Sequence, residues 1–168
     1  KGYTKNTHPS VAKISATMKS RGIDNLKQWR EEAKKEGRIK SKYPALSRNG
    51  DLAELIGVIL GDGHIGKHPR CESLRIVGNG NNPGFANRYA ILVETVFGKK
   101  PHVARRSKSN AINITLYERS ISERLGIPTG SRKHLVYKLP KWIQDNRRFV
   151  VRFLRGLYEA EGCLAHHA

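Results

Sequence analysis

The sequence is poor in cysteine, in acidic residues and in long apolar runs. It has two cysteines, Cys71 and Cys163, whose spacing matches no zinc motif, so we expect reduced, inert thiols. No run of about 18 apolar residues is present, which argues against a membrane-spanning helix. No secretory signal is visible either. We therefore expect a protein that is not secreted and works in the cytoplasm, or in an organelle if the source is eukaryotic.

The shortage of acids leaves a strongly basic chain. Its 168 residues include 32 Lys and Arg against 14 Asp and Glu, a net charge of +18. Such a charge is typical of proteins with a polyanionic partner, most often nucleic acid, although solvated basic faces are the alternative. Residues 1–50 hold 13 of the basic and 4 of the acidic residues. This concentration predicts an appended DNA-binding module.

The N-terminal 50 residues predict two short helices. Pro9 is suited to the first helical position and Gly22 ends that helix, while Asp24 can cap a second helix that ends at Gly37. Two such helices bury little by themselves. The pattern indicates either a helical hairpin that grips phosphate or a solvated hairpin packed on the main domain, followed by a linker from Ser41 to Gly50. The surrounding basic residues are Lys13, Lys19, Arg21, Lys27, Arg30, Lys34, Lys35, Arg38, Lys40 and Lys42.

A sharper helical pattern begins at Asp51. Its apolar residues recur at the spacing of a helix that faces a core. They are Leu52, Leu55, Ile56, Ile59 and Leu60. A second stripe consists of the small residues Ala53, Gly57 and Gly61. Glycine inside a helix costs roughly 1 kcal/mol relative to alanine, so Gly57 predicts that another backbone approaches closely at this stripe.

The middle of the chain alternates paired strands with helices. We expect strands at 64–67, 73–77, 101–106 and 111–117, and helices at 85–97 and 121–125. This order predicts an α+β fold in which an antiparallel sheet has helices on one face and the other face free.

The free sheet face is rich in cationic and amide side chains. Arg reads guanine and Asn reads adenine in the major groove, which a β-ribbon can enter, so we expect DNA contacts there. An ordinary hydrated sheet face is the alternative. The candidate DNA-binding residues on and around this face are Arg70, Arg75, Arg105, Arg106, Lys108, Asn110 and Asn113, with His102 and Thr115 beside them.

A second copy of the helical pattern runs from about Arg147 to Glu161. In an alignment of the two copies, Gly57 matches Gly156, Gly61 matches Ala160, and Asp62 matches Glu161, and each copy then ends in glycine. If the small stripes face each other, the helices pack closely and their C-terminal ends meet. The spacing therefore predicts that the carboxylates of Asp62 and Glu161 lie side by side.

Two adjacent carboxylates at helix C-termini repel each other and face the negative ends of two helix dipoles. A divalent cation removes this conflict, and Mg²⁺ prefers one or two carboxylates with water as the remaining ligands. Such an ion beside a phosphodiester can activate water and stabilise the leaving oxygen. The residues thus favour metal-dependent phosphodiester hydrolysis over two unrelated helix-end acids in water.

The stretches "LIGVILGDG" and "LRGLYEAEG" resemble the two signature helices of LAGLIDADG homing endonucleases. The resemblance covers about residues 51–164. The 99 residues that separate Asp62 from Glu161 are similar to the length of one αββαββα half of a single-chain member. It implies a site-specific double-stranded DNA endonuclease, encoded in an intron, an intein or a free-standing gene, that uses Mg²⁺ held by Asp62 and Glu161. It also implies that Gly61 and Ala160 lie next to the metal and that Lys133 is a basic residue near the site that binds the DNA.

Under this resemblance the chain divides into three parts. Residues 1–50 form a basic helical DNA-binding extension, residues 51–145 a half-domain with a four-stranded DNA-binding sheet, and residues 146–168 the start of a second half-domain. We expect the rest of that second half-domain to come from a longer chain or from a second copy. Two alternatives stay open, a DNA-binding regulator that does not cut and an RNA-binding intron maturase.

Overall fold

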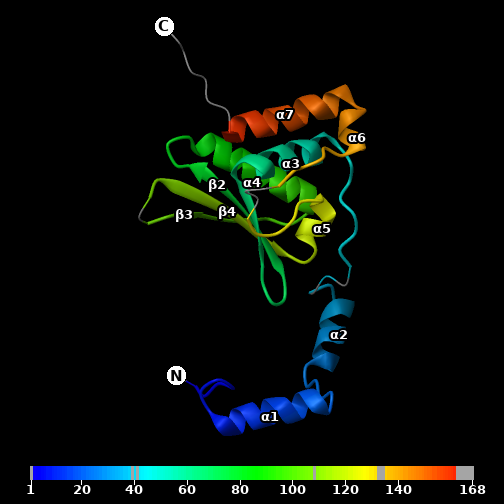
Figure 1. Cartoon of the computed structure of the whole chain (residues 1–168), viewed down its shortest axis with the longest axis vertical. Helices are drawn as coiled ribbons and strands as arrows, with labels where there is room; N and C mark the ends of the chain where they lie inside the picture. The colour runs from blue at the N-terminus through cyan, green and yellow to red at the C-terminus, as the bar shows by residue number, and fades with distance from the viewer. Residues whose placement is uncertain (1, 39, 41, 108, 132–134, 162–168) are drawn as a thin grey trace. The chain divides into compact units, whose positions relative to one another are not determined.

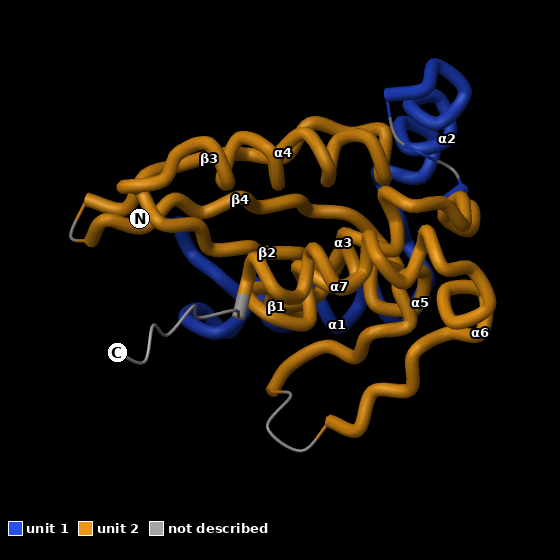
Figure 2. Tube along the Cα trace, turned by 90° about the horizontal axis from the view of Figure 1, so that it is seen from above, with its two compact units in different colours: residues 1–43 blue, residues 44–168 orange. Residues whose placement is uncertain are grey.

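The computed structural model describes residues 2–38, 40, 42–107, 109–131 and 135–161. It divides into two compact units, residues 1–43 and residues 44–168, which are coloured separately in Figure 2. None of the helices in the described ranges has the length and apolar character needed to cross a lipid bilayer.

The first unit contains two short helices, α1 (Pro9–Ser20) and α2 (Lys27–Lys35). The first begins at Pro9, as predicted, and Gly22 follows its end with φ at +61°. The second is capped at Leu26, two residues later than the predicted cap Asp24, because Asp24 builds the preceding turn by accepting a hydrogen bond from the Leu26 N–H at 3.1 Å. No residue of α1 is buried, in keeping with the small core expected of this unit.

The second unit contains all the strands and the remaining helices. In chain order these elements are α3 (Gly50–Asp62), β1 (Gly63–Lys67), β2 (Glu72–Asn79), α4 (Pro83–Phe97), β3 (His102–Arg105), β4 (Ala111–Glu118), α5 (Ile121–Leu125), α6 (Lys141–Gln144) and α7 (Arg147–Glu161). The single turn α6 was not predicted. It follows Pro140, whose φ of −59° suits a helix start.

The four strands form one antiparallel sheet in the order β1-β2-β4-β3. Helices α3, α4 and α5 pack on the sheet, and α7 lies along α3 (Figure 1). The predicted α+β class and the four-stranded antiparallel sheet are therefore confirmed.

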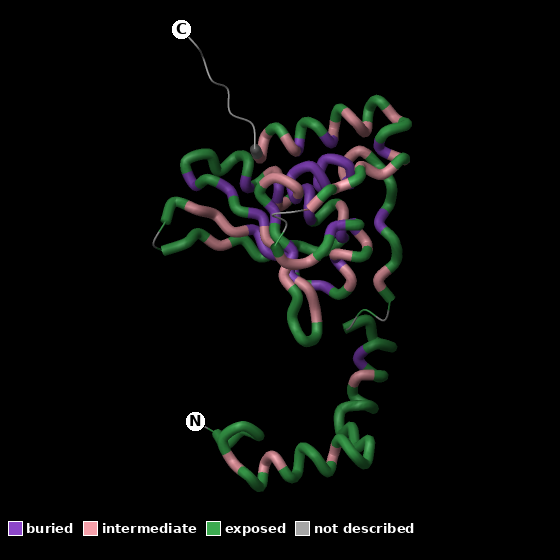
Figure 3. The backbone as a smooth tube through the Cα atoms, viewed as in Figure 1, coloured by how far each residue is buried: buried purple, intermediate pink, exposed green. Residues whose placement is uncertain are grey.

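The strand register separates an apolar face from a polar face. Ile65, Leu74 and Leu116 lie side by side across β1, β2 and β4, and all are buried. They meet the core stripe of α3, where Leu55 and Ile59 are fully buried; Figure 3 shows this concentration of buried residues along α3 and the central strands. We call the opposite side the open face, because none of the helices described in the second unit packs on it.

Helices α3 and α7 pack through glycine at the point where they are closest. A methyl group on Gly57 would lie 2.2 Å from the carbonyl oxygen of Phe153, and one on Gly156 would lie 2.2 Å from that of Glu54. Real Cβ atoms do not approach backbone oxygens so closely, so only glycine fits at both positions. The close approach predicted for Gly57 and Gly156 is thus present.

The two helices run in parallel. Asp51, in the first turn of α3, forms an ion pair with Arg152 in the first half of α7, and the glycine contact follows further along both helices. Their C-terminal ends consequently lie on the same side of the second unit (Figure 1). Asparagine side chains start both helices, since Asn49 Oδ1 accepts from the Leu52 N–H at 2.9 Å and Asn146 Oδ1 from the Arg148 N–H at 3.0 Å.

We predict that Gly57→Ala lowers the free energy of unfolding of the second unit by about 1 to 3 kcal/mol, because the helices must separate to admit the methyl group. Gly84→Ala is the matched control, since a methyl group there meets no atom within 4 Å. Denaturant unfolding followed by circular dichroism measures both. Equal stability of Gly57→Ala and the wild type would contradict the packing described.

Candidate functional site

The C-terminal ends of α3 and α7 form the candidate site. Asp62 is the last residue of α3 and is exposed, and Gly61 before it is partly buried. Ala160, near the end of α7, is also partly buried. Glu161 is the last residue of α7, and its side chain lies outside the described part of the structure. The backbone thus brings the two helix ends to one side, as the motif alignment predicted.

An ion network fixes α7 against α3 and α4 just before these ends. Glu54 of α3 is 2% exposed and forms ion pairs with Arg88 of α4 and Arg152 of α7. Arg88 also pairs with Glu159, which in turn pairs with Arg155 at 3.0 Å. With the Asp51–Arg152 pair, the network contains three carboxylates and three guanidinium groups. The buried Glu54 is therefore compensated, and the network carries no net charge.

Tyr89 connects the network to the helix ends. Its ring is 2% exposed, and burial is the main cause that raises the pKa of its hydroxyl above the ordinary value of 10. The negative charges of Glu159 and Asp62 raise this pKa further, whereas Arg88 lowers it. The carboxylates of Asp62 and Glu159 thus both disfavour ionisation of the same buried hydroxyl.

A divalent cation fits the donor chemistry of the helix ends. The described residues contain no group of three or more His, Cys, Asp or Glu side chains able to hold a metal ion. Mg²⁺ does not need such a cluster, because one or two carboxylates and several waters satisfy it. Asp62 supplies one exposed carboxylate, and the carbonyl oxygens at a helix C-terminus are further oxygen donors.

The open face of the sheet carries polar and cationic side chains without a carboxylate. The register forms a row across all four strands, His64–Arg75–Thr115–His102. The next rows hold Val77 beside Asn113 and Ser73 beside Tyr117. Both acids of the strands, Glu72 and Glu118, lie on the helix-covered side by the same alternation.

The predicted DNA-binding residues fall into several places. Arg75 and Asn113 lie on the open face. Arg70 is in the β1–β2 turn, and Arg106 and Asn110 are in the β3–β4 turn, all exposed. Lys108 and Lys133 lie outside the described residues.

Arg105 alternates to the helix-covered side. Its Nη2 atom donates to the Gly80 carbonyl oxygen at 3.0 Å, so Arg105 links the end of β3 to the turn after β2.

Sequence reasoning missed three features of this site. His64 and Tyr117 on the open face were overlooked, although the strand alternation that identified Arg75 also gives their orientation. The pairing of Arg88 with Glu54 left no local signal, because 34 residues separate the two side chains. The electrostatic influence of the acids on the buried Tyr89 was also missed, because it depends on the tertiary structure.

Comparison with known sequences gives two partial matches. No protein-family model matches the chain. The tRNA-splicing ligase RtcB of Methanopyrus kandleri is 28% identical over 134 residues, which cover 67% of this chain and 13% of the ligase. The RtcB of Pyrococcus abyssi is 30% identical over 133 residues, which cover 70% of this chain and 14% of that protein. The chain therefore spans about one eighth of the length of these relatives.

Comparison with solved structures gives I-DmoI, a homing endonuclease. A variant of I-DmoI bound to its nicked target DNA in the presence of Mn has a TM-score of 0.45 at 17% identity, covering 67% of this chain and 61% of that chain. I-DmoI in complex with DNA and Mn has a TM-score of 0.44 at 16% identity, covering 68% and 63%. A structure of a mesophilic variant of I-DmoI has a TM-score of 0.46 at 17% identity, covering 66% of this chain and 57% of that chain.

We predict that Glu54→Gln lowers the free energy of unfolding by roughly 2 kcal/mol, because it leaves Arg88 and Arg152 without their buried counter-charge. Both guanidinium groups keep partial contact with water, so the cost stays below that of a fully buried pair. Glu94→Gln, an exposed change on α4, is the control. Chemical denaturation measures both, and a loss no larger for Glu54→Gln than for the control would contradict this role.

We predict that the raised pKa of Tyr89 makes the folded protein less stable in alkali. Because its pKa is raised in the folded state, the folded protein keeps this proton longer than the unfolded chain, and stability falls as pH rises above about 10. Tyr89→Phe should flatten this fall, whereas Tyr117→Phe, at a half-exposed ring, should leave it in place. Thermal melts between pH 8 and pH 11 give the comparison, and parallel curves for the wild type and Tyr89→Phe would refute it.

Proposed function

We propose that the chain is the catalytic and DNA-reading part of a LAGLIDADG-type endonuclease that makes site-specific double-strand breaks with a divalent metal. The parallel contact of α3 and α7 at Gly57 and Gly156 carries this proposal. It sends the ends that bear Asp62 and Glu161 to one side, where two carboxylates can share a metal. The strongly basic composition and the open face supply the surface for DNA.

Asp62 and Glu161 are the proposed metal ligands, and Mg²⁺ is the proposed ion. When bound, the ion would supply a Lewis acid and an activated water for phosphodiester hydrolysis. The chain's own part is to hold the two acids in register, which the glycine contact and the ion network do. Gly61 and Ala160 are the proposed small backbone positions next to the ion, where a larger side chain would obstruct it.

Arg75 and Asn113 are the proposed base-contacting residues of the open face. Among the described residues, Asn113 Oδ1 is buried without a hydrogen-bond partner, so a rotation that turns this amide outward would let it pair with a base edge. Arg70, Arg106 and Asn110 are exposed in turns at the ends of the sheet and suit phosphate contacts. In this proposal Arg105 holds the turn after β2 in place through its hydrogen bond to Gly80. The earlier assignments of Lys108 and Lys133 to DNA binding remain part of the proposal.

The outer side of α7 suits a second half-domain. The motif alignment matches Leu52, Leu55 and Ile59, which α3 buries against the sheet, with apolar residues on α7. These counterparts are Val151, Leu154 and Tyr158, which are 57%, 45% and 74% exposed. A second sheet that packs on α7 as this sheet packs on α3 would cover them. A longer chain or a second copy of the chain would provide it.

Residues 1–50 are the proposed DNA-binding extension. Several of the basic residues of α2 are neutralised locally, as in the Lys34–Glu31 and Arg30–Asp24 pairs. Lys13 and Lys19 of α1 form no ion pair within the described ranges, so α1 is the better candidate for phosphate contact. The match covers only about one eighth of each RtcB, and the ligase activity is not transferred to this chain.

We predict that Asp62→Asn abolishes Mg²⁺-dependent cleavage of a randomised DNA library while leaving DNA binding intact, because the change removes a metal ligand and keeps the helix contact. Asp145→Asn, at an exposed aspartate after α6, is the control. Sequencing of the cut ends measures cleavage, and retention on immobilised duplex in Ca²⁺ measures binding.

Three outcomes are decisive. Cleavage by the wild type and by Asp145→Asn, but not by Asp62→Asn, supports the nuclease proposal. Wild-type rates in Asp62→Asn would show that the site is elsewhere. Binding without cleavage by the wild type, given the partner that completes α7, would favour the regulator that does not cut.

A further inference from the structure

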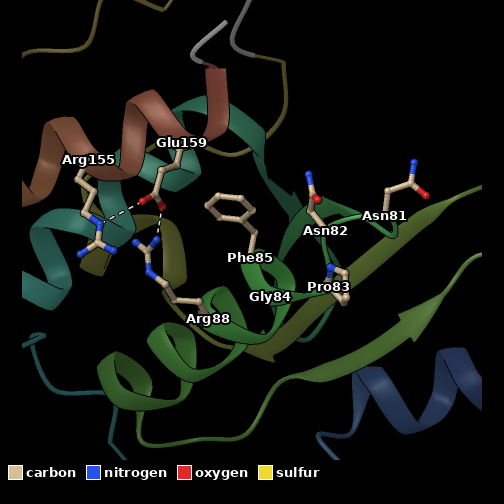
Figure 4. A pocket seen from close by; sticks show the side chains of 8 residues that line it. All are labelled: Asn81, Asn82, Pro83, Gly84, Phe85, Arg88, Arg155 and Glu159. Atoms are coloured by element: carbon tan, nitrogen blue, oxygen red, sulfur yellow. Dashed lines mark hydrogen bonds and ion pairs between the residues drawn. The ribbon is translucent and has the colours of Figure 1, made fainter. Parts of the chain in front are cut away.

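A pocket of about 600 Å³ opens beside the C-terminal half of α7 (Figure 4). Its volume falls within the range of small-molecule sites. It lies between the turn after β2, the start of α4, and α7. The lining residues are Asn81, Asn82, Pro83, Gly84, Phe85, Arg88, Arg155 and Glu159. None of the roles proposed above uses the side chains of Asn82 or Phe85.

Phe85 presents an aromatic ring to this pocket. The ring is 43% exposed and lies between Glu159 and Asn82 in the close view (Figure 4). Its neighbour Tyr89 lies 6.3 Å away between ring centroids, tilted by 42°. Phe85 is therefore held in place by a buried residue while much of its surface stays open. An exposed aromatic ring in a pocket of this size is suited to stacking with a planar ligand.

Asn82 adds a free amide next to this ring. Its side chain does not cap α4, and no hydrogen bond in the described part of the chain uses it. The neighbouring Asn81 differs, because its Oδ1 accepts from the side chain of Asn110. A free amide offers a donor and an acceptor together, which matches the paired acceptor and donor on an adenine edge.

The charges of the pocket are already balanced. Arg88 pairs with Glu159 and with Glu54, and Arg155 pairs with Glu159 at 3.0 Å. A phosphate would compete with these carboxylates for the guanidinium groups. A neutral planar ligand would leave the pairs intact, so the pocket suits a nucleobase better than an anion.

We propose that this pocket accepts one unstacked nucleobase of a bound nucleic acid, with adenine favoured, by stacking on Phe85 and hydrogen bonding to Asn82. The inference rests on the proposed nucleic-acid binding. The pocket adjoins the C-terminal end of α7, because Glu159, two residues before Glu161, lines it. A base held there would be close to the proposed point of cleavage.

The experiment uses two probes of the whole chain. Adenosine, titrated with cytidine in parallel, tests the pocket without any phosphate, and chemical-shift changes of ¹⁵N-labelled protein locate the contact. A single-stranded oligo(dA) tests the pocket in nucleic acid, by fluorescence anisotropy. Three variants are compared with the wild type: Phe85→Ala, Phe85→Leu and Asn82→Ala. Phe85→Leu removes the aromatic ring but keeps apolar bulk. Ile91→Ala is the control, at an exposed position of α4 outside this pocket.

We expect adenosine to shift the signals of Asn82 and Phe85 more than cytidine does. Both Phe85 variants should bind oligo(dA) about fivefold more weakly or worse, since a stacked base is lost, and Ile91→Ala should bind as the wild type does. Unchanged affinity in both Phe85 variants, with salt-dependent DNA binding intact, would overturn the pocket proposal alone. No nucleic-acid binding by the wild type would overturn both proposals. Adenosine binding without DNA cleavage would support the pocket and count against the nuclease.

Discussion

The close contact between Gly57 and Gly156 is the constraint on which the rest of the structure depends. The two backbones touch only where both helices present glycine, since a Cβ at either position would lie 2.2 Å from a carbonyl oxygen of the other helix. Sliding or rotating one helix would bring a larger side chain to this contact, so neither can move independently. The contact therefore fixes the register of α7 on α3. In a parallel pair the register also decides where the ends lie, and those ends bear Asp62 and Glu161.

The arrangement of charge follows from the same packing. The carboxylates near the helix pair are matched one for one by guanidinium groups in the ion network, which leaves the buried Glu54 compensated. The strands place their own acids on the helix-covered side, and the open face keeps only neutral and cationic groups. The acidic side chains thus lie mainly in ion pairs, on the helix-covered side of the sheet and at the helix ends. The excess positive charge of the chain lies on surfaces that a polyanion can reach.

Periodicity predicted most of the fold because it follows directly from burial. The core stripe of α3 and the strand over β4 each depend on a single element facing a core, and both were predicted. The contact of Gly57 with Gly156 was predicted because the motif occurs twice in the chain. Other contacts between distant parts of the chain were not predicted. Arg88 meets Glu54 across 34 residues, Arg105 bridges two turns, and Tyr89 lies within the electrostatic reach of Asp62. Each of these needs the tertiary structure, because no local pattern marks the partner.

The central claim is that the ends of α3 and α7 share one metal ion, and Mn²⁺ affinity tests it most directly. Free Mn²⁺ can be followed by electron paramagnetic resonance for the wild type, Asp62→Asn, Glu161→Gln and the double variant. Shared ligation predicts that either single change weakens binding strongly and that the double change adds little, because one remaining carboxylate holds the ion poorly. Independent and additive effects, or unchanged binding in either single variant, would contradict the account.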